Sequence, residues 1–170
     1  MTLPSATAWY INAKNYSLEL DGKKATAVSL SKNGTRSGES YLLELWFRAD
    51  AGNSSTASIV SVGENDLDLH LTSAGALEMV ASGTNYLVSS TDYRDGQWHH
   101  LALNALKSSS GNATVYVDGV ALKSVSASAV PVLSADCMFL GSHRKATGST
   151  EYNQMLKGGI DEVRIWKQRC

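Results

Sequence analysis

Short runs in which apolar and polar residues alternate recur along the whole chain. Such alternation predicts strands with one buried face, and turn-forming segments rich in Gly, Asn, Asp and Ser separate the runs at roughly 8–12 residues. Helical periodicity is absent. Strands are predicted near residues 16–20, 25–30, 41–48, 57–62, 66–72, 76–80, 86–89, 98–105, 113–118, 120–125, 136–141 and 159–166. About a dozen strands in one chain predict an all-β domain with two packed sheets.

Two segments fix the local geometry more closely. In YLLELWFR the apolar face carries Leu43, Leu45 and Phe47, and the mixed face carries Leu42, Glu44, Trp46 and Arg48. A strand of this kind lies within a sheet, with its second face partly covered. In ATVYVDGVAL the pair Asp118-Gly119 supplies the positive-φ positions of a tight hairpin turn.

Residues 94–103 read RDGQWHHLAL and place His99 beside His100. Adjacent histidines near an Asp suggest a metal site or a catalytic pair. Residues 98–105, however, alternate as a strand, and successive side chains of a strand point to opposite faces. His99 is therefore predicted to face the core with Leu101, and His100 to face the other side. Because rings on opposite faces cannot bind one ion, we expect both to be structural.

Composition narrows the function without naming it. The chain has 170 residues, a formal net charge of −1 and a pI near 6.4, so it lacks the basic surface expected for nucleic acid or anionic lipid. No apolar stretch is long enough to span a bilayer, so membrane insertion is not expected. Two cysteines, Cys137 and Cys170, form neither a disulfide scaffold nor a zinc motif, and a bridge between them stays open.

Four N-x-S/T sequons begin at Asn15, Asn33, Asn53 and Asn112. Together with the richness in Ser, Thr and Gly they are typical of extracellular all-β modules. Such triplets also arise by chance in a chain with this composition, so they do not assign glycosylation by themselves.

The order of several motifs carries a family resemblance. DGQWHHLALN, GNATVYVDGVAL, MFLGS and KGGIDEVRIW follow the opening segments NYSLELDG and YLLELWFRAD. Over residues 15–167 the chain resembles the laminin G-like branch of the concanavalin A-like jelly rolls, which includes the pentraxins. The resemblance implies a two-sheet antiparallel jelly-roll β-sandwich with a concave face. It also implies binding of glycans, proteins or lipids at cell surfaces, often with calcium.

The resemblance also bears on domain organisation. Residues 1–170 are expected to form a single laminin G-like domain, because no linker or internal repeat divides the chain. The last strand-like segment, IDEVRIW, ends four residues before the C-terminus, and the first twenty residues lack a signal-peptide pattern. The chain is therefore expected to be a domain trimmed from a larger secreted protein.

A calcium site is the first candidate that the resemblance implies. In related jelly rolls an Asp on the last strand binds a structural calcium with groups from the N-terminal region. Asp161 of GGIDEVRIW occupies that position here, and Asp21 of LELDG is the candidate acid from the N-terminal side. Calcium prefers six to eight oxygen ligands, including carboxylates. Alternatively, Asp161 caps backbone amides and Asp21 makes the turn at Asp21-Gly22.

The second candidate is the segment GENDLDLHL. Asp66, Asp68 and His70 share one face of a strand, which predicts a solvated face that is either an ordinary outer surface or a ligand groove. The segment is also similar to the E-x-D-x-E strand of laminarinase-type glycosidases, through Glu64, Asp66 and Asp68. Glu64 lies in a turn, however, and stands ~13 Å along an extended strand from Asp68, so an enzyme is not expected.

The third candidate is the loop HRKATGSTEYNQMLK, which joins two strands at residues 143–157. Planar polar groups and aromatic rings recognise sugars, and loops on a rigid scaffold commonly carry binding residues. Arg144, Tyr152, Asn153 and Gln154 are therefore candidate ligand contacts. A solvated connector without a ligand is the alternative.

The other aromatic residues receive structural interpretations. The resemblance implies core or rim positions of strands for four of them: Trp46, Trp98, Phe139 and Trp166. Trp9 and Tyr10 precede the first strand and are candidates for an interface with a neighbouring domain.

The sequence thus favours a non-catalytic binding or adhesion module of an extracellular protein. Its expected partner is a glycan or glycoprotein, and calcium is a possible cofactor. The alternative is a structural module that packs against sibling domains or subunits. A glycosidase, the third hypothesis, requires Glu64 and Asp68 to converge in a cleft.

Overall fold

The fold was analysed on a computed structural model of the chain. It describes residues 17–23, 26–28, 39–63, 66–107, 111–130, 133, 138–144 and 152–168. Within these ranges the secondary structure consists of strands and contains no helix. Accordingly, no helix that could cross a membrane is found in the described part of the chain.

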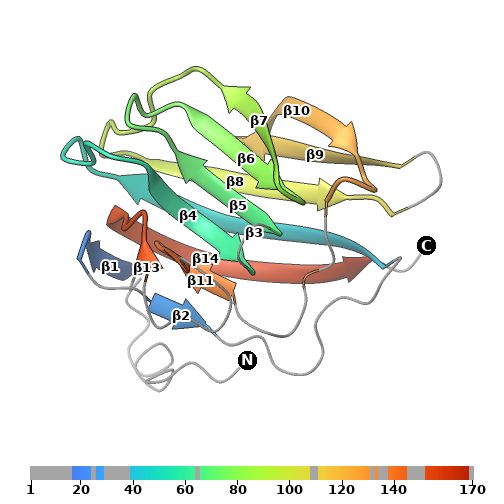
Figure 1. Cartoon of the computed structure of the whole chain (residues 1–170), viewed down its shortest axis with the longest axis horizontal. Coiled ribbons are helices and arrows are strands. Elements are labelled where there is room, and N and C mark those ends of the chain that lie inside the picture. The colour runs from blue at the N-terminus through green and yellow to red at the C-terminus, as the bar shows by residue number, and fades with distance from the viewer. Residues whose placement is uncertain are drawn as a thin grey trace.

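Twelve of the strands form two six-stranded sheets (Figure 1). Sheet A contains, in spatial order, β1 (Leu18–Asp21), β14 (Lys157–Gln168), β3 (Ser40–Ala49), β8 (Trp98–Ala105), β9 (Asn112–Val117) and β10 (Val120–Ser126). Sheet B contains β2 (Thr26–Val28), β11 (Met138–Leu140), β4 (Ala57–Val62), β5 (Leu67–Leu71), β6 (Leu77–Ala81) and β7 (Thr84–Ser89). All neighbouring strands are antiparallel, so the predicted all-β sandwich of two antiparallel sheets is confirmed.

Every strand predicted from the alternation has a counterpart in the two sheets. The loop prediction for residues 143–157 was wrong in part, because this segment contains a short ribbon of β12 (His143–Arg144) and β13 (Tyr152–Asn153). Two-residue strands are too short to produce a recognisable alternation.

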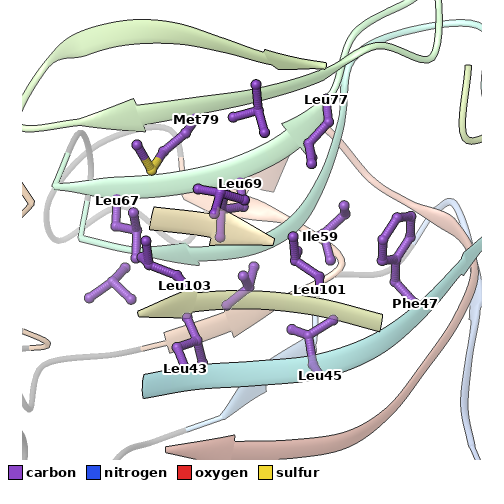
Figure 2. Packing of buried hydrophobic residues seen from close by; sticks show 14 of the residues in the cluster. Leu43, Leu45, Phe47, Ile59, Leu67, Leu69, Leu77, Met79, Leu101 and Leu103 are labelled. Atoms are coloured by element: carbon purple, nitrogen blue, oxygen red, sulfur yellow. The ribbon is translucent and has the colours of Figure 1, made fainter. Parts of the chain in front are cut away.

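The core fills the space between the sheets (Figure 2). On β3 the side chains of Leu43, Leu45 and Phe47 are at most 2% exposed, whereas Trp46 between them is 39% exposed. The predicted separation of an apolar face from a mixed face is therefore confirmed. The same alternation on β8 buries Leu101.

The two adjacent histidines lie on opposite faces of sheet A, as predicted. His99 packs against the rings of Phe47 and Tyr93, with centroids 5.6 and 5.1 Å away, and its Nδ1 lies 2.8 Å from Asp118 Oδ2. His100 packs on the other face against Trp46, 5.2 Å away. The predicted turn is also present: Asp118 and Gly119 both have positive φ, 52° and 79°.

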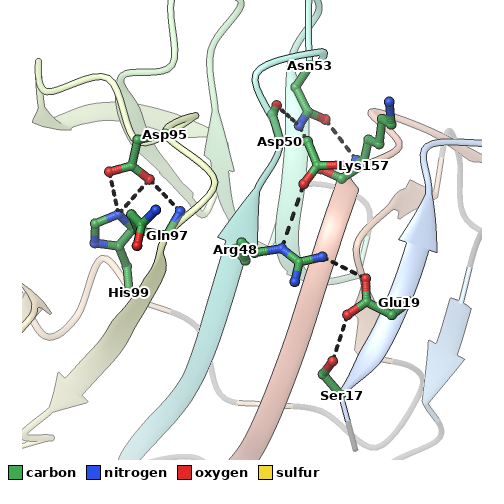
Figure 3. Close-up of polar contacts among 9 residues, drawn as sticks. All are labelled: Ser17, Glu19, Arg48, Asp50, Asn53, Asp95, Gln97, His99 and Lys157. Carbon is green, nitrogen blue, oxygen red and sulfur yellow. Dashed lines mark hydrogen bonds and ion pairs between the residues drawn. The ribbon is translucent and has the colours of Figure 1, made fainter.

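Asn53 ties the end of β3 to the start of β14 (Figure 3). Its side chain is buried and donates from Nδ2 to the carbonyls of Asp50 and Lys157, at 2.6 and 2.7 Å. Its Oδ1 accepts from the Lys157 amide at 2.8 Å. Every polar group of this side chain is thus hydrogen-bonded inside the fold. Asn53 of this sequon therefore has a structural role. Asn15 and Asn33 lie outside the described residues.

A candidate tryptophan-lined site on sheet A

Three tryptophans are exposed on the outer face of sheet A. Trp46, Trp98 and Trp166 are 39%, 37% and 53% exposed. They alternate with the core-facing residues of β3, β8 and β14, so they project away from the sandwich interior. The expectation of core or rim positions was therefore wrong for Trp46, which lies on a strand inside the sheet, although Phe139 is buried. Large apolar side chains gathered on an exposed surface commonly mark a binding site.

The strand register places Trp98 in a row that crosses four strands. Trp98 of β8 is paired with Arg48 of β3, Arg48 with Gly159 of β14, and Gly159 with Glu19 of β1. A Cβ on Gly159 would lie 2.7 Å from Cη2 of Trp98, so the indole lies directly over the glycine backbone. The guanidinium of Arg48 is 5.3 Å from the Trp98 ring centroid, within range of a cation–π contact. Both contacts hold the indole in place.

The next row contains His100, Trp46 and Asp161. Beyond Asp161, strand β14 has a bulge with one extra residue before pairing resumes at Arg164. The bulge residue Glu162 has a φ of 52°, in the left-handed region. In a regular strand Glu162 would point to the opposite side from Asp161. The bulge instead brings both carboxylates to the same face.

A pocket of about 340 Å³ opens between these rows. It is lined by Ser17, Trp46, Trp98, Asp161 and Glu162. The volume lies at the lower end of the range for small-molecule sites, and the lining combines aromatic surface with a few convergent polar groups. This chemistry suits a compact ligand that has an apolar face and hydrogen-bond donors.

The pocket and its rim are acidic. Arg48 forms ion pairs with Glu19 at 2.7 Å and with Asp50 at 3.7 Å, and Figure 3 shows its guanidinium between these two carboxylates. Asp161 accepts a hydrogen bond from the Glu162 amide at 2.7 Å. Partial burial raises the pKa of Asp161 above its ordinary value, partly opposed by the charge of Arg164. Arg164 itself pairs with Glu162.

Glu44 braces the neighbouring aromatic side chains. It accepts a hydrogen bond from Trp166 Nε1 at 2.9 Å and lies 3.4 Å from His100 Nε2, whose ring packs against Trp46. Arg164 lies 4.0 Å away on the same face. The tryptophan face is therefore held by polar contacts before any ligand binds, which lowers the entropic cost of binding.

The structure does not bring the two predicted calcium ligands together. Asp21 is paired with Lys157 on β14, four residues from Asp161, which corresponds to ~13 Å along a strand. Asp21 accepts the Lys23 amide at 2.8 Å, as the turn alternative proposed. In the described ranges no cluster of three or more His, Cys, Asp or Glu residues could hold a metal ion. The two residues do not fit one calcium site, and calcium binding stays a prediction.

The prediction of a solvated face on β5 was wrong. Asp68 and His70 are only 2% and 6% exposed. Asp68 Oδ1 accepts from Ser58 Oγ at 2.6 Å. His70 Nδ1 lies 3.2 Å from Asp68 Oδ2, close enough for an ion pair but without the geometry of a hydrogen bond. His70 Nε2 lies 3.3 Å from Glu78 Oε2. These residues form a buried polar network within sheet B. Neither is a surface for ligands.

Part of the cover over this face comes from the segment that follows β11. Ser61, which is paired with Asp68, donates to the Ser142 carbonyl at 2.9 Å. Tyr152 packs against Phe139 with ring centroids 5.3 Å apart. Contacts of this kind join residues far apart in sequence, so the alternation within β5 does not reveal them. Asp66 precedes β5 and is exposed, and Glu64 lies outside the described residues.

The predicted loop contacts lie in or next to the β12–β13 ribbon, which is separate from the two large sheets and contacts β4 and β11 of sheet B. Arg144 is paired with Tyr152 in the β12–β13 ribbon, and the Arg144 side chain lies outside the described part. Asn153 is exposed beside His143. Gln154 has a φ of 52°, and its carbonyl accepts from the Ser58 amide at 2.8 Å. The ribbon thus brings Arg144, Tyr152 and Asn153 together. Tyr152, however, packs against Phe139, and Gln154 links the ribbon to β4 through its backbone carbonyl.

Comparison with protein families shows to which superfamily this sandwich belongs. Residues 10–169 match the Laminin_G_3 family model, described as Concanavalin A-like lectin/glucanases superfamily. The chain belongs to this superfamily. No curated protein sequence is significantly similar to it.

Some predictions concern residues of this concanavalin A-like domain that lie outside the described ranges: Trp9, Tyr10, Cys137 and Cys170.

Solved structures similar to this concanavalin A-like domain include the CBM40 of the Ruminococcus gnavus IT-sialidase. With that CBM40 bound to alpha2,3 sialyllactose the TM-score is 0.64 at 17% identity, over 89% of each chain. A putative carbohydrate binding protein from Bacteroides ovatus has a TM-score of 0.58 at 20% identity, over 84% of this chain and 40% of that chain. Trypanosoma rangeli sialidase has a TM-score of 0.64 at 15% identity, over 91% of this chain and 25% of that chain. At these identities the likeness shows a shared fold.

One sequence signal pointed to the tryptophan site of this concanavalin A-like domain. The alternation placed Trp46 between Glu44 and Arg48 on the mixed face of its strand. A tryptophan between two charged residues on a non-core face is a candidate for exposure. The pairing of β8, β3 and β14 that assembles the pocket has no local signal.

Proposed function

We propose that this domain is a non-catalytic module of a larger extracellular protein and that it binds glycans in the tryptophan-lined pocket. The observation that carries the proposal is the exposure of Trp46 and Trp98 beside two carboxylates in one pocket. A sugar ring has an apolar C–H face that packs on an indole, while its hydroxyls donate to carboxylates. Asp161 and Glu162 supply such acceptors, and Ser17 supplies a hydroxyl.

The solved structures support this function by analogy. The Ruminococcus gnavus CBM40 carries sialyllactose on a sandwich of this fold, and it is similar to the chain over nearly its whole length. Fold analogy alone is a weak argument for function. The pocket in this chain adds an independent chemical argument, because its side chains suit a sugar.

The arrangement of carboxylates favours binding over catalysis. Glycosidases place two carboxyl groups on either side of the scissile bond. Asp161 and Glu162 are adjacent on one strand, so both approach a ligand from the same side of the pocket. Glu162 is also held by Arg164. Neither carboxylate faces a partner across the pocket in the part of the chain that the structure describes.

Alanine substitution of the two pocket tryptophans tests the proposal. We expect Trp46→Ala and Trp98→Ala each to weaken binding to glycans identified on an array by at least about tenfold, because a buried aromatic contact often dominates an interface. Leu87→Ala is the matched control, since Leu87 is 54% exposed but lies on β7 of sheet B. Circular dichroism checks the fold of each variant. Unchanged binding in both tryptophan variants would refute the site.

The exposed tryptophans also favour a second candidate function, a protein-docking module. Tryptophan is enriched at protein interfaces, and Trp166 extends the apolar surface beyond the pocket. Two results together would favour this alternative. No glycan on the array binds, and a sibling domain binds with an affinity that Trp46→Ala reduces.

A further inference from the structure

The charges around the tryptophan pocket determine which glycans it can accept. This inference rests on the proposed function and concerns the same site. Five carboxylates lie in or beside the pocket: Glu19, Glu44, Asp50, Asp161 and Glu162. Two arginines, Arg48 and Arg164, contact them. The formal charge of these seven side chains is therefore −3, from two positive and five negative groups.

Both arginines are already paired with acids of this domain. Arg48 uses Nη2 on Glu19 and directs Nε toward Asp50, and its guanidinium also lies near the face of Trp98. Arg164 contacts Glu162 and Glu44. A ligand carboxylate that approaches either arginine also meets the internal carboxylates bound to it. Like charges at this distance oppose the binding of an acidic ligand.

The hydrogen-bonding groups of the pocket lead to the same result. Asp161 and Glu162 are acceptors when ionised, and the Ser17 hydroxyl already donates to Glu19 at 2.7 Å, which leaves its oxygen free to accept. These polar groups therefore present acceptors to the ligand, and the indole N–H groups of Trp46 and Trp98 are the donors of the lining. Sugar hydroxyls can donate to the acceptors and accept from an indole, whereas a ligand carboxylate has no proton to donate to the acceptors.

We infer that the pocket is selective for neutral, hydroxyl-rich glycans and rejects sialylated or otherwise acidic ones. The rejection is electrostatic, so it acts on the charge of the glycan and not on its size. In this respect the chain differs from the Ruminococcus gnavus CBM40, whose solved structures include alpha2,3 and alpha2,6 sialyllactose. The same fold then displays sites of opposite charge preference.

An array of matched glycans tests the inference. The probes are lactose, N-acetyllactosamine and neutral β-glucan oligosaccharides, together with the sialylated forms of the first two. We expect binding to one or more of the neutral members that depends on Trp98, and binding to the sialylated partner of a bound disaccharide that is weaker by about tenfold or more. Equal or tighter binding of the sialylated partner, still dependent on Trp98, overturns the inference and leaves the proposed function standing. Binding of no glycan overturns the proposed function itself.

The methyl ester of 3′-sialyllactose separates charge from size. The ester keeps the bulk of the sialic acid but removes its negative charge. We expect its affinity to return toward that of lactose, and the difference between acid and ester to shrink as salt screens the interaction. Rejection of the ester as strongly as of the acid overturns the electrostatic inference.

Removing one acid from the pocket provides the reciprocal test. Asp161→Asn keeps the size of the side chain but deletes its charge. We expect this variant to narrow the difference between the sialylated and neutral partners by several-fold, while Glu39→Gln, which removes an acid that pairs with Lys167 away from the pocket, leaves the difference unchanged. An unchanged difference in the Asp161 variant, with Trp98-dependent binding retained, overturns the inference.

Discussion

The buried side chain of Asn53 permits a quantitative prediction. Asn53→Ala deletes three hydrogen bonds of 2.6–2.8 Å that join the end of β3 to the start of β14. In the variant, the Asp50 carbonyl still accepts from the backbone amide of residue 53. The Lys157 carbonyl still accepts from the Asp50 amide. The Lys157 amide loses its side-chain acceptor. One unpaired donor costs about 1–3 kcal/mol and each of the two other lost bonds about 1 kcal/mol, so we expect a loss of about 3–5 kcal/mol.

Urea unfolding of three variants measures this contribution. A loss of that size lowers the midpoint of thermal unfolding by about 6–20 °C for a chain of this length. Asn53→Asp should be comparably destabilised, since a carboxylate keeps the acceptor for Lys157 but faces two carbonyls with no proton to donate. Ser55→Ala removes the same sequon at an exposed position and should lie within about 0.5 kcal/mol of the parent protein. If Asn53→Ala also lies within that margin, the structural role is refuted.

Three further predictions follow from other parts of the fold. Burial lowers the pKa of His70, but Asp68 and Glu78 outweigh it and raise the pKa above its ordinary value. The resulting stabilisation of the folded state is present below about pH 6.5 and is lost as pH rises through the folded pKa. His70→Gln should therefore flatten the dependence of the unfolding free energy on pH in that window. An unchanged slope in the variant would contradict this prediction. Leu69→Ala, at a site that is 1% exposed, should cost about 2–5 kcal/mol in urea unfolding. Because Asp21 and Asp161 lie far apart in register, calorimetry should detect no calcium binding that depends on both residues.

The sequence predicted the strands well because their alternation is a local property. The faces of β3, the hairpin turn at Asp118 and the separation of His99 from His100 all depend on residues within one or two strands. A period of two specifies which side chains point to the same side of a strand. The chain therefore encodes its layers in a form that can be recognised directly.

The site was harder to predict because it depends on contacts between distant segments. Trp98, Arg48 and Gly159 meet through strand pairing that no local pattern specifies. The same limit explains the error on β5. Its polar face looked solvated, but Asp68 and His70 take partners from β4 and β6 and are buried. Alternation identifies a face but not what covers it.

The extra residue in β14 has a consequence for comparing this domain with its relatives. Deleting a single residue between Asp161 and Arg164 would let the strand pair evenly with β3, and one of the two neighbouring acids would be lost or turned inward. A relative could then match the chain at almost every position and still lack one of the two carboxylates that line the pocket. The length of this segment, as much as its composition, should be examined when ligand preference is transferred from one member of the superfamily to another.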